Sequence, residues 1–176
     1  MGDSLITVVA IFLAAILMFV FPLMSVAERT DDISQLSVQT TTTEFVDDIV
    51  TTGKVTLSDY DAFISELTAT GNSFDVEIVI QQLDENPSSK TTQAESTKIG
   101  ENLYYTIYTT QVTEELNSNG RITLKEGDIV TVTVKNTNQT IAQLLRNFFY
   151  MVSGNDSYQI AAQDSWLVLV NGSTSD

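Results

Sequence analysis

The side chains in this sequence that could do chemistry are almost all carboxylates. The 176 residues include 23 Asp and Glu against 8 Lys and Arg, with no Cys and no His. Without Cys there is no thiol nucleophile, disulfide or thiolate metal site. Without His, the commonest metal ligand and the usual general base near neutral pH are missing. Enzyme classes that depend on these groups are therefore excluded.

The acids occur in close pairs, but no pair belongs to a recognisable catalytic or metal-binding motif. Asp59 and Asp61, and Asp84 and Glu85, come nearest to a cation site. A calcium loop needs several spaced oxygens and a glycine turn, and neither pair has them. Two carboxylates can hydrolyse a glycoside, but no motif places two of them against an apolar pocket. We therefore expect solvated acids, no metal, no cofactor and no enzymatic activity.

The net charge of −15 limits the partners of the chain. A field of that sign repels nucleic acid and anionic lipid headgroups. We expect no nucleic-acid partner.

A run of 23 residues without a charge, from Leu5 to Ala27, dominates the N-terminus. As a helix it would be about 34 Å long, enough to cross the hydrocarbon core of a bilayer. We predict that residues 1–27 are a transmembrane anchor in contact with membrane lipid. The predicted lipid-facing residues are Leu5, Ile6, Val9, Phe12, Leu13, Ile16, Leu17 and Phe19.

A cleaved secretory signal is the alternative to a retained anchor. Ser25-Val26-Ala27 resembles a small-x-small cleavage site. However, the apolar run is longer than the core of a typical signal peptide, and no Lys or Arg precedes it. These two features favour retention.

The sequence contains opposing signals for the orientation in the membrane. Arg29 alone lies near the apolar run, and its position slightly favours a cytoplasmic C-terminus. The Thr-, Ser-, Asn- and Gln-rich composition and three glycosylation sequons favour exposure outside the cell. We expect the C-terminal domain at the cell surface, with the cytoplasm as the alternative. The possible glycosylation sites are Asn138, Asn155 and Asn171.

Residues 28–72 are predicted to form a helical stalk or hairpin. The stretch 28–52 has no Gly or Pro and continues the anchor helix, which Gly53 ends. A second helix is predicted over 58–67, with Ser58 as its N-cap and an apolar face.

Residues 73–176 are predicted to be the head. One part is ambiguous: in 103–116, Tyr104, Tyr108 and Val112 have helical spacing, but the aromatic and β-branched content suits a strand. Its length favours a helix. The other predicted elements are a strand over 74–80, a polar loop over 84–98, strands over 122–124 and 129–134 around a turn, a helix over 141–152 capped by Thr140, and strands over 158–162 and 166–170.

The predicted fold class is α+β. The order after residue 72 is strand, helix, strand, strand, helix, strand, which matches a split βαβ sandwich of ferredoxin-like order. In that arrangement the helices cover one face of an antiparallel sheet.

The N-terminal third resembles the type IV pilin and pseudopilin class. A short polar leader, Met1-Gly-Asp-Ser4, precedes the apolar run, and Pro22 lies where pilins often carry a helix-kinking proline. The stretches 31–86 and 125–138 are also similar to uncharacterised pilin-like proteins of Tad-type secretion loci in Gram-positive bacteria. Pilins usually have a glutamate five residues into the mature chain, and this sequence has Leu5 there, or Thr7 if it is cut after Gly2.

The resemblance implies a structural subunit of a surface filament or secretion pseudopilus. Copies would pack through the apolar helix, with Pro22 letting the helix bend. Asp3 would either set the register between copies or be a favourable helix-start charge at the membrane interface. The alternative is a single-pass membrane accessory protein of a secretion or conjugation complex.

Overall fold

The computed structural model describes residues 2–84, 104–150 and 159–172. It has the expected α+β class, in which a long N-terminal helix is followed by antiparallel sheets and further helices. The elements are α1 (Gly2–Thr52), β1 (Lys54–Thr56), α2 (Leu57–Ala69), β2 (Phe74–Leu83), β3 (Tyr104–Ile107), α3 (Thr109–Asn119), β4 (Arg121–Thr123), β5 (Ile129–Asn136), α4 (Ile141–Tyr150) and β6 (Ala161–Leu167).

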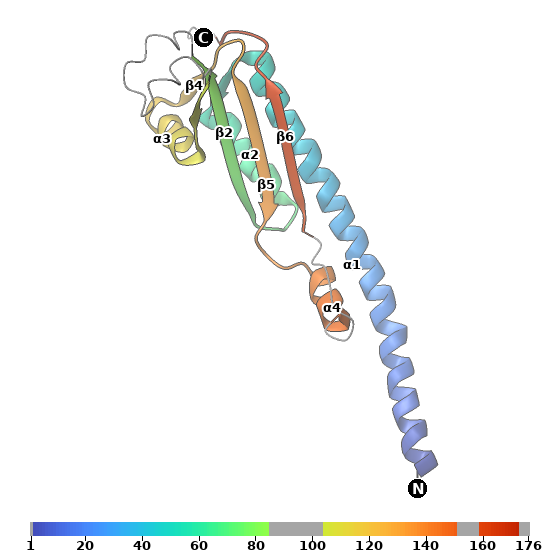
Figure 1. Cartoon of the computed structure of the whole chain (residues 1–176). Helices are drawn as coiled ribbons and strands as arrows, with labels where there is room; N and C mark the ends of the chain where they lie inside the picture. Colours follow the sequence, from blue (N-terminus) through green and yellow to red (C-terminus); the bar gives the residue numbers. More distant parts are fainter. Residues whose placement is uncertain (1, 85–103, 151–158, 173–176) are drawn as a thin grey trace, which may run out of the picture.

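Helix α1 is continuous over 51 residues, passing through Pro22 and beyond the apolar run. At 1.5 Å per residue it is about 77 Å long. Its two halves differ in environment: no residue from Asp3 to Val26 is buried, whereas Val38, Val46 and Ile49 are in the core. The first half therefore projects from the head as a bare rod, while the second half packs against the sheet (Figure 1). The predicted continuation of the apolar helix beyond residue 27 is confirmed.

The ends of α1 and α2 follow local chemistry. Gly53 ends α1 with a φ of +66°, as expected. Helix α2 begins one residue before the predicted cap, because Thr56 and not Ser58 is the N-cap. Its hydroxyl accepts from the Asp59 amide at 3.2 Å, and the Asp59 carboxylate accepts from the Thr56 amide at 3.1 Å. This capping box starts the helix directly after β1.

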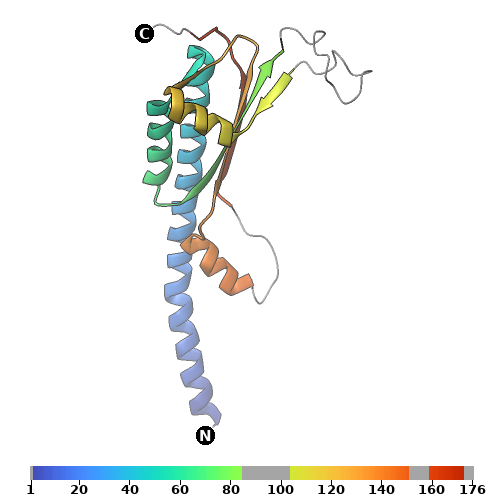
Figure 2. The same cartoon turned by 90° about the vertical axis from the view of Figure 1, so that its left-hand side faces the viewer.

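The main sheet has four strands in the order β3-β2-β5-β6, and all neighbours are antiparallel. Along the central strand β5, Val130, Val132 and Val134 are buried and alternate with Thr131 and Thr133, which are half-buried. Helices α1, α2 and α3 all contribute buried residues to the core on the valine side. Viewed edge-on, α1 and α2 lie on one side of the sheet (Figure 2). The expected layer of helices on one face is thus observed.

The ferredoxin-like order is not observed. The next element described after β2 is its antiparallel neighbour β3, and no helix lies between them in the part of the chain that the structure describes. The stretch predicted as one helix over 103–116 is strand β3 followed by helix α3. The helix prediction was wrong for 104–107, where aromatic and β-branched side chains pair with β2.

Two other strand predictions change in detail. Strands β4 and β5 flank the predicted turn but belong to different sheets, because β4 pairs with β1. The two predicted C-terminal strand pieces merge into β6, which pairs along its whole length with β5. Most of the predicted polar loop over 84–98 lies outside the described residues.

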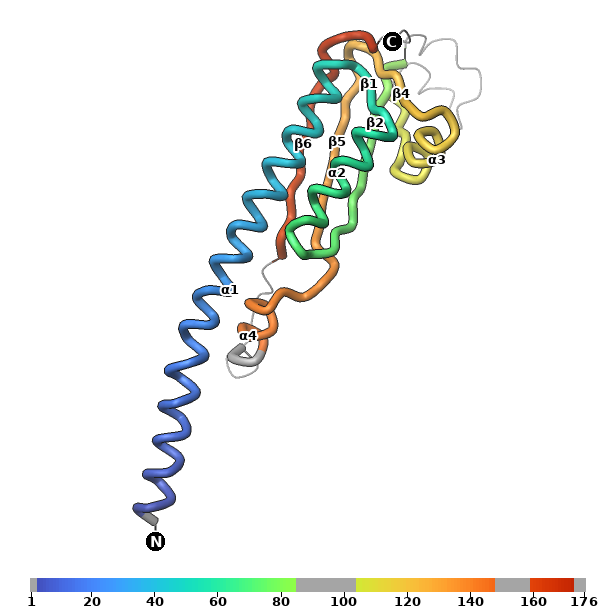
Figure 3. Tube along the Cα trace, turned by 180° about the vertical axis from the view of Figure 1, so that it is seen from behind, coloured from blue at the N-terminus to red at the C-terminus, as the bar shows by residue number. Residues whose placement is uncertain are grey.

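One hydrophobic core joins the predicted stalk to the predicted head. The core cluster contains Val38, Ile49 and Leu67 from the stalk together with Ile78 and Val132 from the head. The stacked rings of Phe45 and Phe63, 4.2 Å apart, add an α1–α2 contact to this core. From behind, α1 and α2 run side by side along the sheet (Figure 3). Residues from both predicted segments, 28–72 and 73–176, therefore pack in the same core.

Candidate functional site

The bare half of α1 is the most prominent candidate for function. All eight predicted anchor residues are exposed, from 40% for Leu17 to 75% for Phe19. The helix is long and apolar enough to span a membrane, and no part of its most apolar 18-residue stretch is buried in the protein. Large apolar side chains cost about 1.5–3 kcal/mol each when left in water. An exposed apolar surface of this size on one projecting helix is typical of a membrane or protein interaction site.

Asp3 and Pro22, the two predicted assembly residues, are not brought together. They are nineteen positions apart in the helix, which is roughly 28 Å along the axis. Both side chains are exposed, and the Asp3 carbonyl accepts from the Thr7 hydroxyl at 2.8 Å. An acid in the first turn of α1 also suits the positive end of the helix dipole. Among the described residues of this chain, none forms a hydrogen bond or ion pair with the Asp3 carboxylate.

A second site that sequence reasoning missed lies where α1 leaves the apolar run. Here the foot of the head, helix α4, packs against α1 (Figure 1). The Thr140 hydroxyl donates to the Asp31 carboxylate at 2.6 Å, and Arg146 pairs with Glu28 at 3.3 Å. Asp31 is only 5% exposed. These two contacts attach α4 to the first turns of α1 after the anchor.

The start of α4 was predicted correctly. The Thr140 hydroxyl accepts from the Gln143 amide at 3.2 Å, and the Gln143 side-chain oxygen accepts from the Thr140 amide at 3.1 Å. This reciprocal pair is a capping box. Thr140 therefore both starts α4 and binds α1 through its hydroxyl.

One turn further along α1, Gln35 binds the outer edge of β6. Its side-chain nitrogen donates to the Ala161 carbonyl at 2.6 Å, and its oxygen accepts from the Ala161 amide at 3.0 Å. The side-chain amide thus takes the place of a neighbouring strand and closes part of an edge that would otherwise offer unpaired backbone groups. It also fixes α1 to the sheet.

Several of the described carboxylates have structural roles. Asp128, 2% exposed, accepts from the amides of Leu83 at 2.8 Å and Lys125 at 2.9 Å. Asp59 forms the α2 cap, and Asp61 is exposed. Among the described residues, no three acids come close enough together to hold a metal ion.

The predicted glycosylation sites differ in their settings. Asn138 is half-buried: its side-chain oxygen accepts from the Ser73 amide at 2.8 Å, and its side-chain nitrogen, to which a glycan would be attached, donates to Asn72 at 3.0 Å. Asn171 is exposed, although its side-chain oxygen accepts from the Glu126 amide at 2.9 Å. Asn155 lies outside the described residues.

Two features of the sequence belong to the contacts between α4 and α1 that were not predicted. One is the group of charges directly after the apolar run, which includes Glu28 and Asp31. The other is the apolar stripe of the 141–152 helix. Neither feature identifies its partner, because residues 28 and 146 are far apart in the sequence and meet only through the fold.

No protein-family model, characterised protein or solved structure matches this chain.

Proposed function

We propose that this chain is a pilin-like or pseudopilin-like structural subunit that assembles through its N-terminal apolar helix. The observation that carries the proposal is the division of α1 into a bare apolar half and a half embedded in the head. In this proposal the bare half of α1 lies in the membrane before assembly. It then packs against copies of itself in a surface filament or secretion pseudopilus.

The physical argument concerns where an apolar helix can reside. Eight large apolar side chains leaving lipid for water would cost about 12–24 kcal/mol at about 1.5–3 kcal/mol each. That cost is avoided if the helices bury one another in a bundle as they leave the bilayer. The continuity of α1 supports the proposal further. Because the apolar half and the half packed in the head belong to one helix, moving the apolar half out of the membrane would carry the head with it.

The proposed location of the head is outside the cell. A single cysteine at Gln163, which is exposed on β6, tests this because the chain has no other cysteine. An impermeant maleimide should label it in intact cells. Labelling that requires lysis would place the head in the cytoplasm and remove the filament proposal.

The second candidate is a single-pass membrane accessory protein of a secretion or conjugation complex. The observation that favours it is the absence of an acid at Leu5 or Thr7, where a pilin usually has its glutamate. Both candidates predict a non-catalytic protein whose partners are membrane lipid, copies of itself or secretion machinery.

Mechanical shearing of cells separates the two candidates. A filament subunit should appear in the sheared fraction as a chain that still carries its apolar helix, as measured by intact-mass spectrometry. An accessory protein should stay in the membrane pellet, both after shearing and after extraction with alkaline carbonate. Complete recovery in that pellet would overturn the filament proposal.

A further inference from the structure

We propose that α4 is a second membrane contact, lying in the lipid interface with its outer apolar face among the acyl chains. This inference rests on the proposed anchoring of α1 in the same membrane. The proposed partner is the lipid bilayer itself and not another protein.

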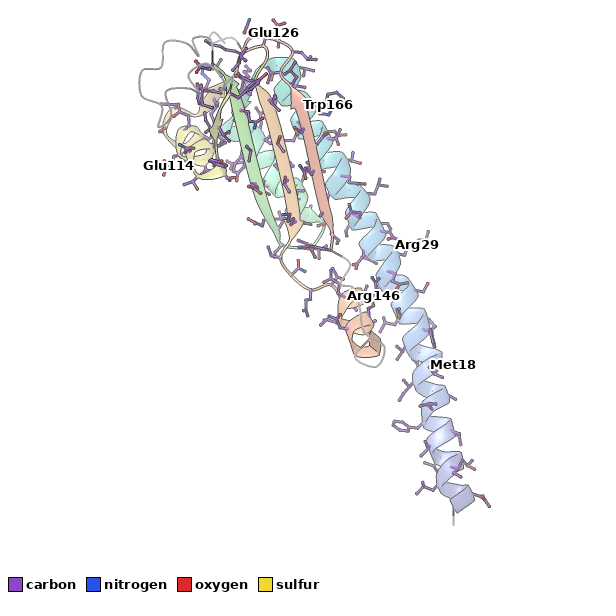
Figure 4. All side chains as sticks on the ribbon, in the orientation of Figure 1. Met18, Arg29, Glu114, Glu126, Arg146 and Trp166 are labelled. Carbon is purple, nitrogen blue, oxygen red and sulfur yellow. The ribbon has the colours of Figure 1, made fainter. Side chains whose placement is uncertain are left out.

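The level of α4 along α1 is the first argument. Its contacts are with Glu28 and Asp31, within about two turns after the apolar run ends at Ala27. If the anchor spans the bilayer, these residues lie at the boundary between lipid and water. Figure 4 shows Arg146 at this foot of the head, Met18 in the bare half, and Trp166 far up on the head.

The direction of α4 is the second argument. Thr140 and Arg146 lie about 9 Å apart along the axis of α4. Their partners Asp31 and Glu28 lie only about 4.5 Å apart along the axis of α1. Helix α4 therefore crosses α1 obliquely and descends slowly toward the membrane end (Figure 2). An oblique helix at this level has one long side turned toward the bilayer.

The third argument is the distribution of exposed side chains around α4. Ala142 and Gln143 are buried, at 1% and 8% exposure. Ile141 and Leu144, on another side of the helix, are 63% and 52% exposed. A helix that is fixed to the protein on one side and carries large apolar side chains outward is typical of interfacial membrane helices.

Continuity with the anchor is the argument that identifies lipid as the occupant. A groove of about 340 Å³ between α1 and α4 is lined by Leu23 and Val26 from the anchor and by Ile141 from α4. Leu23 and Val26 are themselves 52% and 64% exposed. The apolar surface therefore runs from the anchor onto α4, and lipid that surrounds Leu23 and Val26 would also reach Ile141.

The charge of the chain is compatible with this contact. The proposed attraction is apolar, so it does not depend on anionic headgroups, which the net charge of −15 would repel. The groove also has polar walls, including Asp31 and Asn138, which suit the headgroup region. Such a second contact would hold the head in a fixed tilt on the membrane until assembly withdraws the anchor.

Tryptophan fluorescence of the full-length chain in phosphatidylcholine vesicles tests the proposal. The chain has one tryptophan, Trp166, which is 57% exposed on the head and serves as the water-exposed control. In a Trp166→Phe background, Leu144→Trp reports on α4 and Phe12→Trp on the anchor. Lipids brominated near the headgroup end of the acyl chain quench only indoles that enter the bilayer, and iodide quenches only indoles in water.

We expect Leu144→Trp to emit at shorter wavelength than native Trp166 and to be quenched by shallow brominated lipid but not by iodide. Ile141→Trp should behave in the same way. If brominated lipid quenches Phe12→Trp while iodide quenches Leu144→Trp and Ile141→Trp, the anchoring of α1 is supported and the membrane contact of α4 is refuted. Protection from both quenchers that grows with protein density would mean that a second copy covers α4, and it would also overturn the lipid proposal. If Phe12→Trp escapes lipid quenching too, the proposed anchoring itself fails.

Discussion

The backbones of Gly53 and Gly172 lie so close together that neither residue has room for a β-carbon. A Cβ added at Gly53 would lie 2.5 Å from the backbone nitrogen of Gly172 and 2.5 Å from the carbonyl oxygen of Val170. The Leu124 amide donates to the Gly53 carbonyl at 2.8 Å, and the Gly172 amide donates to the Leu124 carbonyl at 2.9 Å. The end of the long helix is therefore held by the C-terminal segment and by the residue that follows β4.

The first prediction is that Gly53→Ala destabilises the head much more than Gly71→Ala. Both glycines have positive φ, +66° and +82°, so both substitutions strain the backbone by about 1–2 kcal/mol. Only Gly53 also meets backbone atoms, which adds about 1–3 kcal/mol of overpacking. Urea unfolding of the full-length chain in detergent, followed by circular dichroism, measures the difference.

Gly172→Ala separates the two effects, because it adds the steric clash at a residue without positive φ. We expect a cost close to the difference between the other two variants. Equal stabilities of Gly53→Ala and Gly71→Ala would show that the close approach is absent.

The second prediction concerns the buried Asp128. Asp128→Ala would leave the amides of Leu83 and Lys125 without their acceptor and should cost about 2–4 kcal/mol. Asp128→Asn keeps one acceptor oxygen in the same shape and should lose clearly less. The same unfolding experiment compares the two, and a harmless Asp128→Ala would be evidence against this structural role.

The third prediction concerns stability at alkaline pH. Burial, and then the negative charge of Asp61, raise the pKa of Tyr60 above its ordinary value of 10.0. The folded protein thus holds this proton more tightly than the unfolded chain, so stability falls as pH rises above about 10 toward the folded pKa. Tyr60→Phe removes this proton and should lose less stability between about pH 9 and about pH 11. Identical losses in the two proteins would contradict the assigned shift.

Local patterns predicted those elements whose signals are complete within a few residues. The alternation through 74–80 predicted β2, and the Thr140 cap with the stripe after it predicted α4. The mistake at 104–107 arose because the spacing of Tyr104, Tyr108 and Val112 fits a helix, whereas pairing with β2 decides the outcome. Sheet order also escaped prediction, since no local signal tells β4 to pair with β1.

The long apolar helix could be predicted because its signal lies in composition alone. The foot of the head could not, because Asp31 and Gln35 look like ordinary stalk residues until the fold brings Thr140 and Ala161 beside them. The same reason applies to Asp128, whose role depends on two distant backbone amides becoming buried.

The fourth prediction tests Asp3 in assembly. If Asp3 pairs with the free amine of a neighbouring copy, Asp3→Ala should insert normally into the membrane but yield no filament, because the neighbour's charge would be buried without a partner. The other interpretation, a favourable charge at the start of α1, expects normal assembly. Asp32→Ala, which removes an exposed acid of α1 beyond the anchor, is the matched control and should assemble. Filaments from Asp3→Ala at the wild-type level would exclude the register role.

Electron microscopy of sheared cell-surface material tests the central claim most directly. Filaments should bind an antibody against the head along their length, and their averaged cross-section should show a central bundle of helices with the heads outside. That result would place the bare half of α1 among its own copies. Sheared material with no filament containing this chain, while the full-length chain remains in the membrane, would contradict the account.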